Sequence, residues 1–90
     1  MTMKPVALAC ASLVTLLGAC GSGPECTTEP RSAWMSEEAM KSRVASLGYR
    51  VNEFKVSGSC YEIYGWDREG RKAEVYFNPV SGEIVKSEID

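Results

Sequence analysis

The sequence contains no histidine among its 90 residues, and this absence narrows the chemistry that the protein can perform. Histidine is the commonest general base, the commonest metal ligand and the usual haem ligand. Acid–base chemistry by carboxylates alone remains open, but such chemistry is less common. We therefore expect a protein that is not an enzyme, with no catalytic residue, no metal site and no cofactor.

The sequence also lacks an excess of basic residues. It holds 10 Lys and Arg against 12 Asp and Glu, which gives a net charge of −2. A protein that binds nucleic acid needs a basic face, and one that binds anionic lipid electrostatically needs a polybasic segment. The composition therefore predicts no nucleic-acid partner and no membrane attachment through basic residues.

A hydrophobic run long enough to span a bilayer is absent too. The longest apolar run, residues 5–17, falls short of the roughly 20 residues that a membrane-spanning helix needs. It follows a short N-terminus whose one charge is Lys4, which is typical of a secretory signal peptide. A short anchor or a buried core helix is the alternative.

The apolar run ends in Leu17-Gly18-Ala19-Cys20, which resembles the lipobox of bacterial lipoproteins. That resemblance implies a diacylglycerol group on Cys20 and cleavage just before it, so that residues 1–19 form a lipoprotein-type signal peptide. Acyl chains contribute about 0.8 kcal/mol for each buried CH₂ group, which is enough for two or three chains to anchor a protein stably. The alternative is ordinary signal cleavage.

The two cleavage modes predict different locations. A lipid-anchored protein would face the periplasm. The residue after Cys20 is Gly21 and not Asp, which by resemblance to other lipoproteins favours anchoring in the outer membrane. Ordinary cleavage near Ala19 or Gly23 would instead give a soluble periplasmic protein. Both place the protein in the cell envelope.

The four cysteines have different expected fates. Cys10 leaves with the signal and Cys20 carries lipid, which leaves Cys26 and Cys60. Their spacing does not suit a metal site, and disulfides persist outside the cytoplasm. We predict that these two form a disulfide, which would stabilise the domain by about 4 kcal/mol; two free thiols are the alternative.

The mature chain divides into a tether, residues 20–33, and a folded domain, residues 34–90. The tether is rich in Gly, Ser, Pro, Thr and Glu.

A helix is predicted after Ser36, a good N-cap, and Gly48 suits its C-terminal end. Its apolar stripe, at positions i, i+4 and i+7, consists of Met40, Val44 and Leu47.

The sequence pattern in the rest of the domain predicts four strands separated by turns, over residues 49–56, 60–66, 71–78 and 83–87. If Asp67 pairs with Arg71 across the second turn, each hairpin sorts its side chains consistently into two faces. The expected fold class is α+β, with one helix packed across one face of a four-stranded antiparallel β-meander. The expected core face comprises Phe54, Val56, Tyr61, Ile63, Val75, Phe77 and Ile84.

The opposite face of the predicted sheet carries three aromatic residues, Tyr64, Trp66 and Tyr76, which make it the candidate binding face. In the alternative, Trp34 and the N-terminal segment fold over these residues and extend the core. Glu62 and Glu74 lie on the same face, where we expect solvated surface charges and not an acid–base pair.

Several of these segments together resemble a PepSY domain, of the small single-domain exported kind. They are Trp34 with the capped helix, Gly48-Tyr49, Cys60 to Tyr64, and most specifically the turn from Asn78 to Glu83. The resemblance implies a cystatin-like fold, in agreement with the predicted helix on a meander. PepSY domains occur in propeptides of secreted metalloproteases, in periplasmic parts of membrane reductases, and alone, and no catalytic residues belong to their motif.

The function expected from these features is non-catalytic. We expect a PepSY-like envelope domain that binds or modulates another envelope protein, such as a peptidase or a membrane oxidoreductase. One alternative is a peptidase inhibitor, and another is a structural or stress-related small lipoprotein without a defined ligand.

Overall fold

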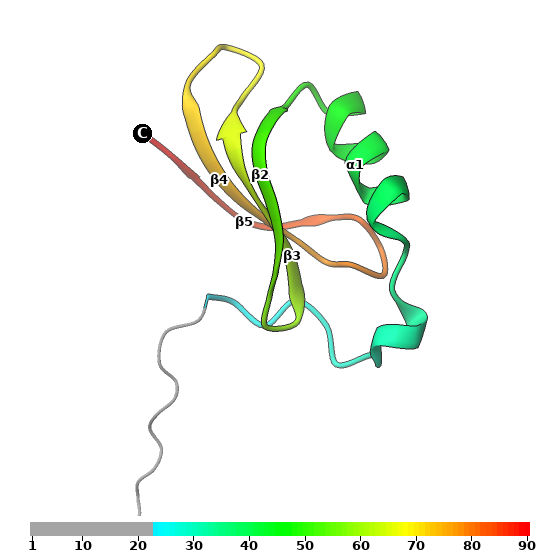
Figure 1. Cartoon of the computed structure of the whole chain (residues 1–90). Helices are drawn as coiled ribbons and strands as arrows, with labels where there is room; N and C mark the ends of the chain where they lie inside the picture. Colours follow the sequence, from blue (N-terminus) through cyan, green and yellow to red (C-terminus); the bar gives the residue numbers. More distant parts are fainter. Residues whose placement is uncertain (1–22) are drawn as a thin grey trace, which may run out of the picture.

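The computed structural model describes residues 23–90, so the predicted signal peptide and Cys20, the predicted lipidation site, lie outside the described residues. The fold is α+β, as predicted, with one α-helix and one four-stranded antiparallel sheet in the order β2-β3-β4-β5 (Figure 1). The elements in chain order are η3 (Arg31–Ala33), α1 (Glu37–Ser46), β2 (Arg50–Ser57), β3 (Cys60–Trp66), β4 (Lys72–Phe77) and β5 (Ile84–Ile89). In this part of the chain, no helix has the length and apolarity needed to cross a bilayer.

Helix α1 begins and ends as the sequence predicts. At its start the Ala39 N–H donates to Ser36 Oγ at 3.0 Å, which satisfies one of the free amides of the first turn. At its end Gly48 has a φ of +97°, a conformation that glycine adopts without strain. The amide after Gly48, that of Tyr49, donates back to Val44 O at 3.3 Å and completes a Schellman motif.

The predicted register of the central hairpin is confirmed. The Asp67 amide donates to Arg71 O at 2.8 Å across the turn. Tyr64 pairs with Glu74 in the β3–β4 ladder. Because side chains alternate along a strand, this register fixes which residues face α1 and which face away from it.

The core lies between α1 and the middle of the sheet. Its buried residues are Met40, Val44, Tyr61, Ile63, Ala73, Val75 and Phe77. Trp34 packs edge-on against Tyr61, with ring centroids 5.3 Å apart, on the side that faces α1. The predicted core is therefore correct in the central strands.

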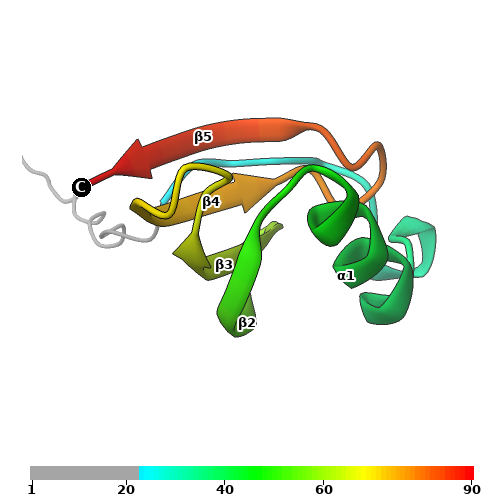
Figure 2. The ribbon, with the colours of Figure 1, turned by 90° about the horizontal axis from the view of Figure 1, so that it is seen from above.

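The prediction is wrong at two positions on the edge strands. Val56 in β2 is 36% exposed and Ile84 in β5 is 44% exposed, although both were assigned to the core. Strand parity correctly points the two side chains away from the outer side of the sheet, but their exposure shows that the short helix leaves these two positions uncovered. Figure 2 shows β5 along one edge of the twisted sheet, on the far side from β2.

Candidate binding face

The face of the sheet opposite α1, hereafter the outer face, carries most of the residues that the sequence singled out. Along β3, alternation places the side chains of Glu62, Tyr64 and Trp66 there. The β3–β4 register adds Tyr76 and Glu74 across from them. The structure therefore brings the three predicted aromatic residues onto one face.

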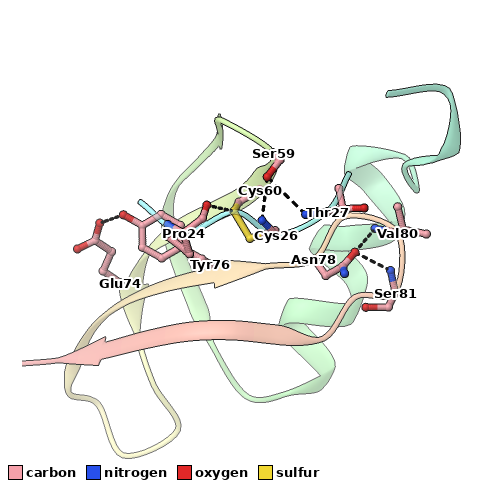
Figure 3. Close-up of a disulfide and its surroundings, with 10 residues drawn as sticks. All are labelled: Pro24, Cys26, Thr27, Ser59, Cys60, Glu74, Tyr76, Asn78, Val80 and Ser81. Carbon is pink, nitrogen blue, oxygen red and sulfur yellow. Dashed lines mark hydrogen bonds between the residues drawn. A yellow bond between two sulfur atoms is a disulfide. The ribbon is translucent and has the colours of Figure 1, made fainter. Parts of the chain in front are cut away.

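The N-terminal segment crosses one end of this outer face (Figures 1 and 3). A disulfide joins Cys26 to Cys60 at the start of β3, as predicted, with the two Cα atoms 5.1 Å apart. The Cys26 amide donates to Ser59 Oγ at 2.8 Å. Gly23 lies so close to the ring of Tyr76 that a Cβ atom there would come within 2.8 Å of Cε2. The described part of the predicted tether thus packs against the sheet.

This covering segment gives Glu62 an environment that the sequence did not predict. Glu62 is only 2% exposed, so the expectation of a solvated surface charge was wrong. It pairs with Tyr76 in register and lies two residues from Cys60, between the two points where the segment is held. Within residues 23–90, its Oε2 atom has no hydrogen-bond partner.

The pKa values of Glu62 and Glu74 are shifted in opposite directions because the surroundings of the two carboxyl groups differ. Burial, followed by hydrogen bonding with Glu74, raises the pKa of Glu62 above its ordinary value. Hydrogen bonds from Glu62 and from Tyr76 lower the pKa of Glu74; the Tyr76 hydroxyl donates to Glu74 Oε2 at 2.8 Å. Of the two carboxyl groups, Glu62 therefore gives up its proton at the higher pH.

The two tyrosines around this pair keep their protons more firmly than usual. Hydrogen bonding with Glu74 raises the pKa of Tyr64, while burial is the main cause that raises the pKa of Tyr76. A tyrosinate beside two carboxyl groups would be destabilised by burial and by like charge. Both hydroxyls therefore stay protonated at neutral pH.

Tyr64 and Trp66 remain partly accessible, each with a cation from β2 over its ring. Lys55 Nζ lies 5.1 Å from the centroid of Tyr64, and Arg50 Cζ lies 4.7 Å from that of Trp66. Lys72 pairs with Trp66 in register, but the cation over the ring is Arg50. These contacts hold the two rings against the sheet.

A pocket of about 330 Å³ opens where Tyr64 and Trp66 are uncovered. It is lined by Asn52, Tyr64, Gly65, Trp66, Lys72, Ala73, Glu74, Glu88 and Asp90. Tyr76, the third predicted binding residue, is not among them because Gly23 lies against its ring. The candidate site thus keeps two of the predicted aromatics, and the alternative of a covering N-terminal segment holds for the third.

The acidic part of the pocket was missed by sequence reasoning. Glu88 and Asp90 lie beyond residue 87, where the predicted fourth strand ended, whereas β5 continues to Ile89. The alternation of Lys86, Glu88 and the apolar Ile89 was the signal that could have extended the strand. Glu74 lies opposite Glu88 in register, so three carboxylates and Lys72 line the pocket, and Lys86 forms an ion pair of 3.2 Å with Glu88.

The pocket is lined mainly by aromatic and charged side chains and by Asn52. The pocket lining contains no serine, threonine or cysteine nucleophile. In the described range, no group of three His, Cys, Asp or Glu side chains is placed to hold a metal ion. Aromatic walls with surplus carboxylates favour a cationic group, such as a basic side chain of a partner protein.

A known protein family matches the sequence. The family model described as "Peptidase propeptide and YPEB domain" matches residues 7–88, nearly the whole chain. No curated protein matches the chain, and no solved structure matches it.

Proposed function

The chain belongs to the PepSY family of peptidase propeptide and YPEB domains, and from this premise we propose that it is a non-catalytic envelope domain that binds a segment of another envelope protein on its outer face. The observation that carries the proposal is the pocket beside Tyr64 and Trp66. Partly exposed tyrosine and tryptophan side chains at the centre of a pocket are the commonest energetic anchors of protein interfaces.

Size and charge specify the kind of segment. A volume of about 330 Å³ is at the lower end of ligand pockets, and it suits one or two side chains better than a large cofactor. Glu88 is paired with Lys86, but Glu74 and Asp90 form no salt bridge within residues 23–90, so an arginine or lysine of the partner would find both carboxylates and an aromatic wall. We therefore propose a basic residue as the anchor of the bound segment.

We infer an envelope location from the N-terminal residues. The signal-like run and the lipobox-like residues before Cys20 support export and lipid attachment. A lipid-anchored domain and a membrane-bound partner are confined to the same surface. This confinement raises their effective concentration, so that even a pocket of low affinity can be occupied. Membrane peptidases and membrane oxidoreductases are the partner classes that the PepSY resemblance suggests.

The proposal is tested by replacing the pocket aromatics. The Tyr64→Ser and Trp66→Ser double variant of the full chain should reduce capture of envelope partners by at least about tenfold, since interface tyrosines and tryptophans often contribute more than about 1 kcal/mol each. Val80→Ser is the matched control, because Val80 is 38% exposed and lies in the turn before β5. Cross-linked partners identified by mass spectrometry from envelopes of the exporting cell provide the readout.

Circular dichroism and a thermal melt show whether the fold persists. A folded double variant that captures the same partners as the wild type would contradict the binding site. A double variant that unfolds would show that the two aromatics stabilise the sheet itself, and the proposal would then fail as well.

A peptidase inhibitor is the second candidate function, and the family description favours it. An inhibitor would abolish the activity of an envelope peptidase at about one molecule per enzyme. Titration of the purified chain against envelope peptidase activity measures this directly. Loss of inhibition in the Trp66→Ser variant would place the inhibitory contact at the same pocket.

A further inference from the structure

Strand β5 presents an unpaired edge to its surroundings. All six of its residues are exposed, and its only ladder is with β4. Among residues 23–90, no strand pairs with its other side. Figure 2 shows β5 along the margin of the sheet. Such an edge is a template for pairing with another strand unless some feature blocks it.

The backbone groups that face this edge can be identified from the ladder. The Asp90 amide donates to Lys72 O at 3.0 Å, so the backbone of Asp90 points toward β4. Backbone direction alternates along an antiparallel strand, and the register is regular from Lys86 to Ile89. Ser87 and Ile89 therefore point their N–H and C=O groups outward, to the free edge.

The other edge of the sheet is less suited to pairing. Strand β2 has an irregularity between Val51 and Glu53, and a bulge of this kind interrupts the row of outward-pointing groups. On β5 the corresponding irregularity lies at the beginning of the strand, opposite Tyr76 and Phe77. The four residues from Lys86 to Ile89 are left as an even, exposed edge.

We propose that a second copy of this chain pairs with β5 in an antiparallel, two-fold symmetric ladder centred on Ser87. Two-fold pairing of a strand with itself places residues at equal distances from the centre opposite each other. A centre at Lys86 would place Lys86 opposite Lys86 of the second copy, and a centre at Glu88 would oppose two glutamates. Only the centre at Ser87 places Lys86 opposite Glu88 twice.

The side chains support this register. Lys86 and Glu88 already form an ion pair of 3.2 Å on one face of the strand, so pairing would build a square of two cations and two anions. Val85 and Ile89, exposed by 43% and 40%, would come opposite each other. Because Glu88 lines the pocket, Lys86 of the second copy would also lie at the pocket rim.

Cysteine cross-linking of the full chain in an exporting bacterium tests the proposal. Paired residues at such a position have Cα atoms about 5.5 Å apart, within the range that a disulfide spans. Ser87→Cys should give a covalent dimer on a non-reducing gel after mild oxidation. Glu53→Cys, an exposed position on β2 at the opposite edge, is the matched control and should remain monomeric.

Charge variants then test the register. In the Ser87→Cys background, Lys86→Glu and Glu88→Lys should each reduce cross-linking by about tenfold, because each places like charges opposite one another twice. Co-expression of the two variants should restore cross-linking between them, since each glutamate then meets a lysine. Circular dichroism confirms that each variant is folded.

The proposal is overturned if Ser87→Cys cross-links no more than Glu53→Cys. It is equally overturned if cross-linking ignores both charge changes, because the copies would then meet in another register. Neither result affects the pocket proposal, whose readout is capture of a different protein.

Discussion

At the scale of single residues, the most unusual group is Glu62. A carboxyl group that is 2% exposed is rare in a small domain, and its Oε2 atom has no partner among residues 23–90. Burial makes the charged form of this group costly, so Glu62 holds its proton to a higher pH than an exposed glutamate does. Opposite pKa shifts in two adjacent carboxyl groups are the expected result.

The pair makes stability depend on pH in a predictable direction. The folded-state pKa of Glu62 lies above its ordinary value of 4.5. As the pH rises above 4.5, the unfolded chain loses this proton first, and the free energy of unfolding falls until the pH passes the folded-state pKa. Glu74, whose pKa is lowered, acts in the opposite sense and loses its stabilising contribution as the pH falls below 4.5.

The Glu62→Gln variant should therefore melt at nearly the wild-type temperature near about pH 4 and several degrees higher near about pH 8. A gain of about 1 kcal/mol corresponds to about 4–8 °C in a domain of this size. Thermal melts across this pH range measure the difference. Glu53→Gln, an exposed glutamate in β2, is the control and should show no such trend. A difference that stays constant with pH would contradict a proton held on Glu62.

At the scale of elements, the disulfide decides where the N-terminal segment lies. Cys60 projects from the outer face, so its bond to Cys26 brings residues 23–27 to that face and not to the α1 side. The pairing of Cys26 with Cys60 was predictable from the sequence. The alternation of side chains along β3 also predicted that Cys60 points to the outer face. The burial of Glu62 and Tyr76 could have been inferred by combining the two, because a segment held at Cys60 must cross their neighbourhood.

The disulfide should be detectable as a covalent link between two tryptic peptides, one with Cys26 and one with Cys60, that separate only after reduction. Reduction should lower the free energy of unfolding by about 4 kcal/mol, as expected for a closed loop of this length. Ser59→Ala removes the hydrogen bonds that Ser59 Oγ accepts from the amides of Cys26 and Thr27, at 2.8 and 3.4 Å, and should cost about 1 kcal/mol. Separate peptides without reductant would contradict the bond.

The periodic parts of the fold could be predicted from the sequence, and the non-periodic parts could not. Strand β3 has the predicted bounds and α1 has the predicted cap, because alternation and capping are local signals. The exposure of Val56 and Ile84 depends on how far one helix extends over a sheet, which is not a local property. The acidic side of the pocket was missed because β5 continues through a charged stretch with few apolar residues.

At the scale of the whole molecule, the sheet is covered on both faces, but unequally. Helix α1 and Trp34 cover one side with apolar contacts, whereas a short extended segment held by one disulfide covers part of the other. The uncovered remainder of the outer face holds the pocket, next to the unpaired edge of β5. Partner binding and self-pairing would therefore use adjacent surfaces.

Lipid attachment at Cys20 would set the position of these surfaces relative to a membrane. Gly23 is in contact with Tyr76, and three residues of chain span at most about 11 Å. A lipidated Cys20 would therefore hold this end of the sheet close to the headgroups.

We expect metabolic labelling with a palmitate analogue to mark the full chain and to be abolished in Cys20→Ala. Cys10→Ala is the matched control and should label normally, because Cys10 lies within the predicted signal. Equal labelling of the wild type and Cys20→Ala would rule out the anchor, and the protein would then reach its partners by diffusion through the periplasm.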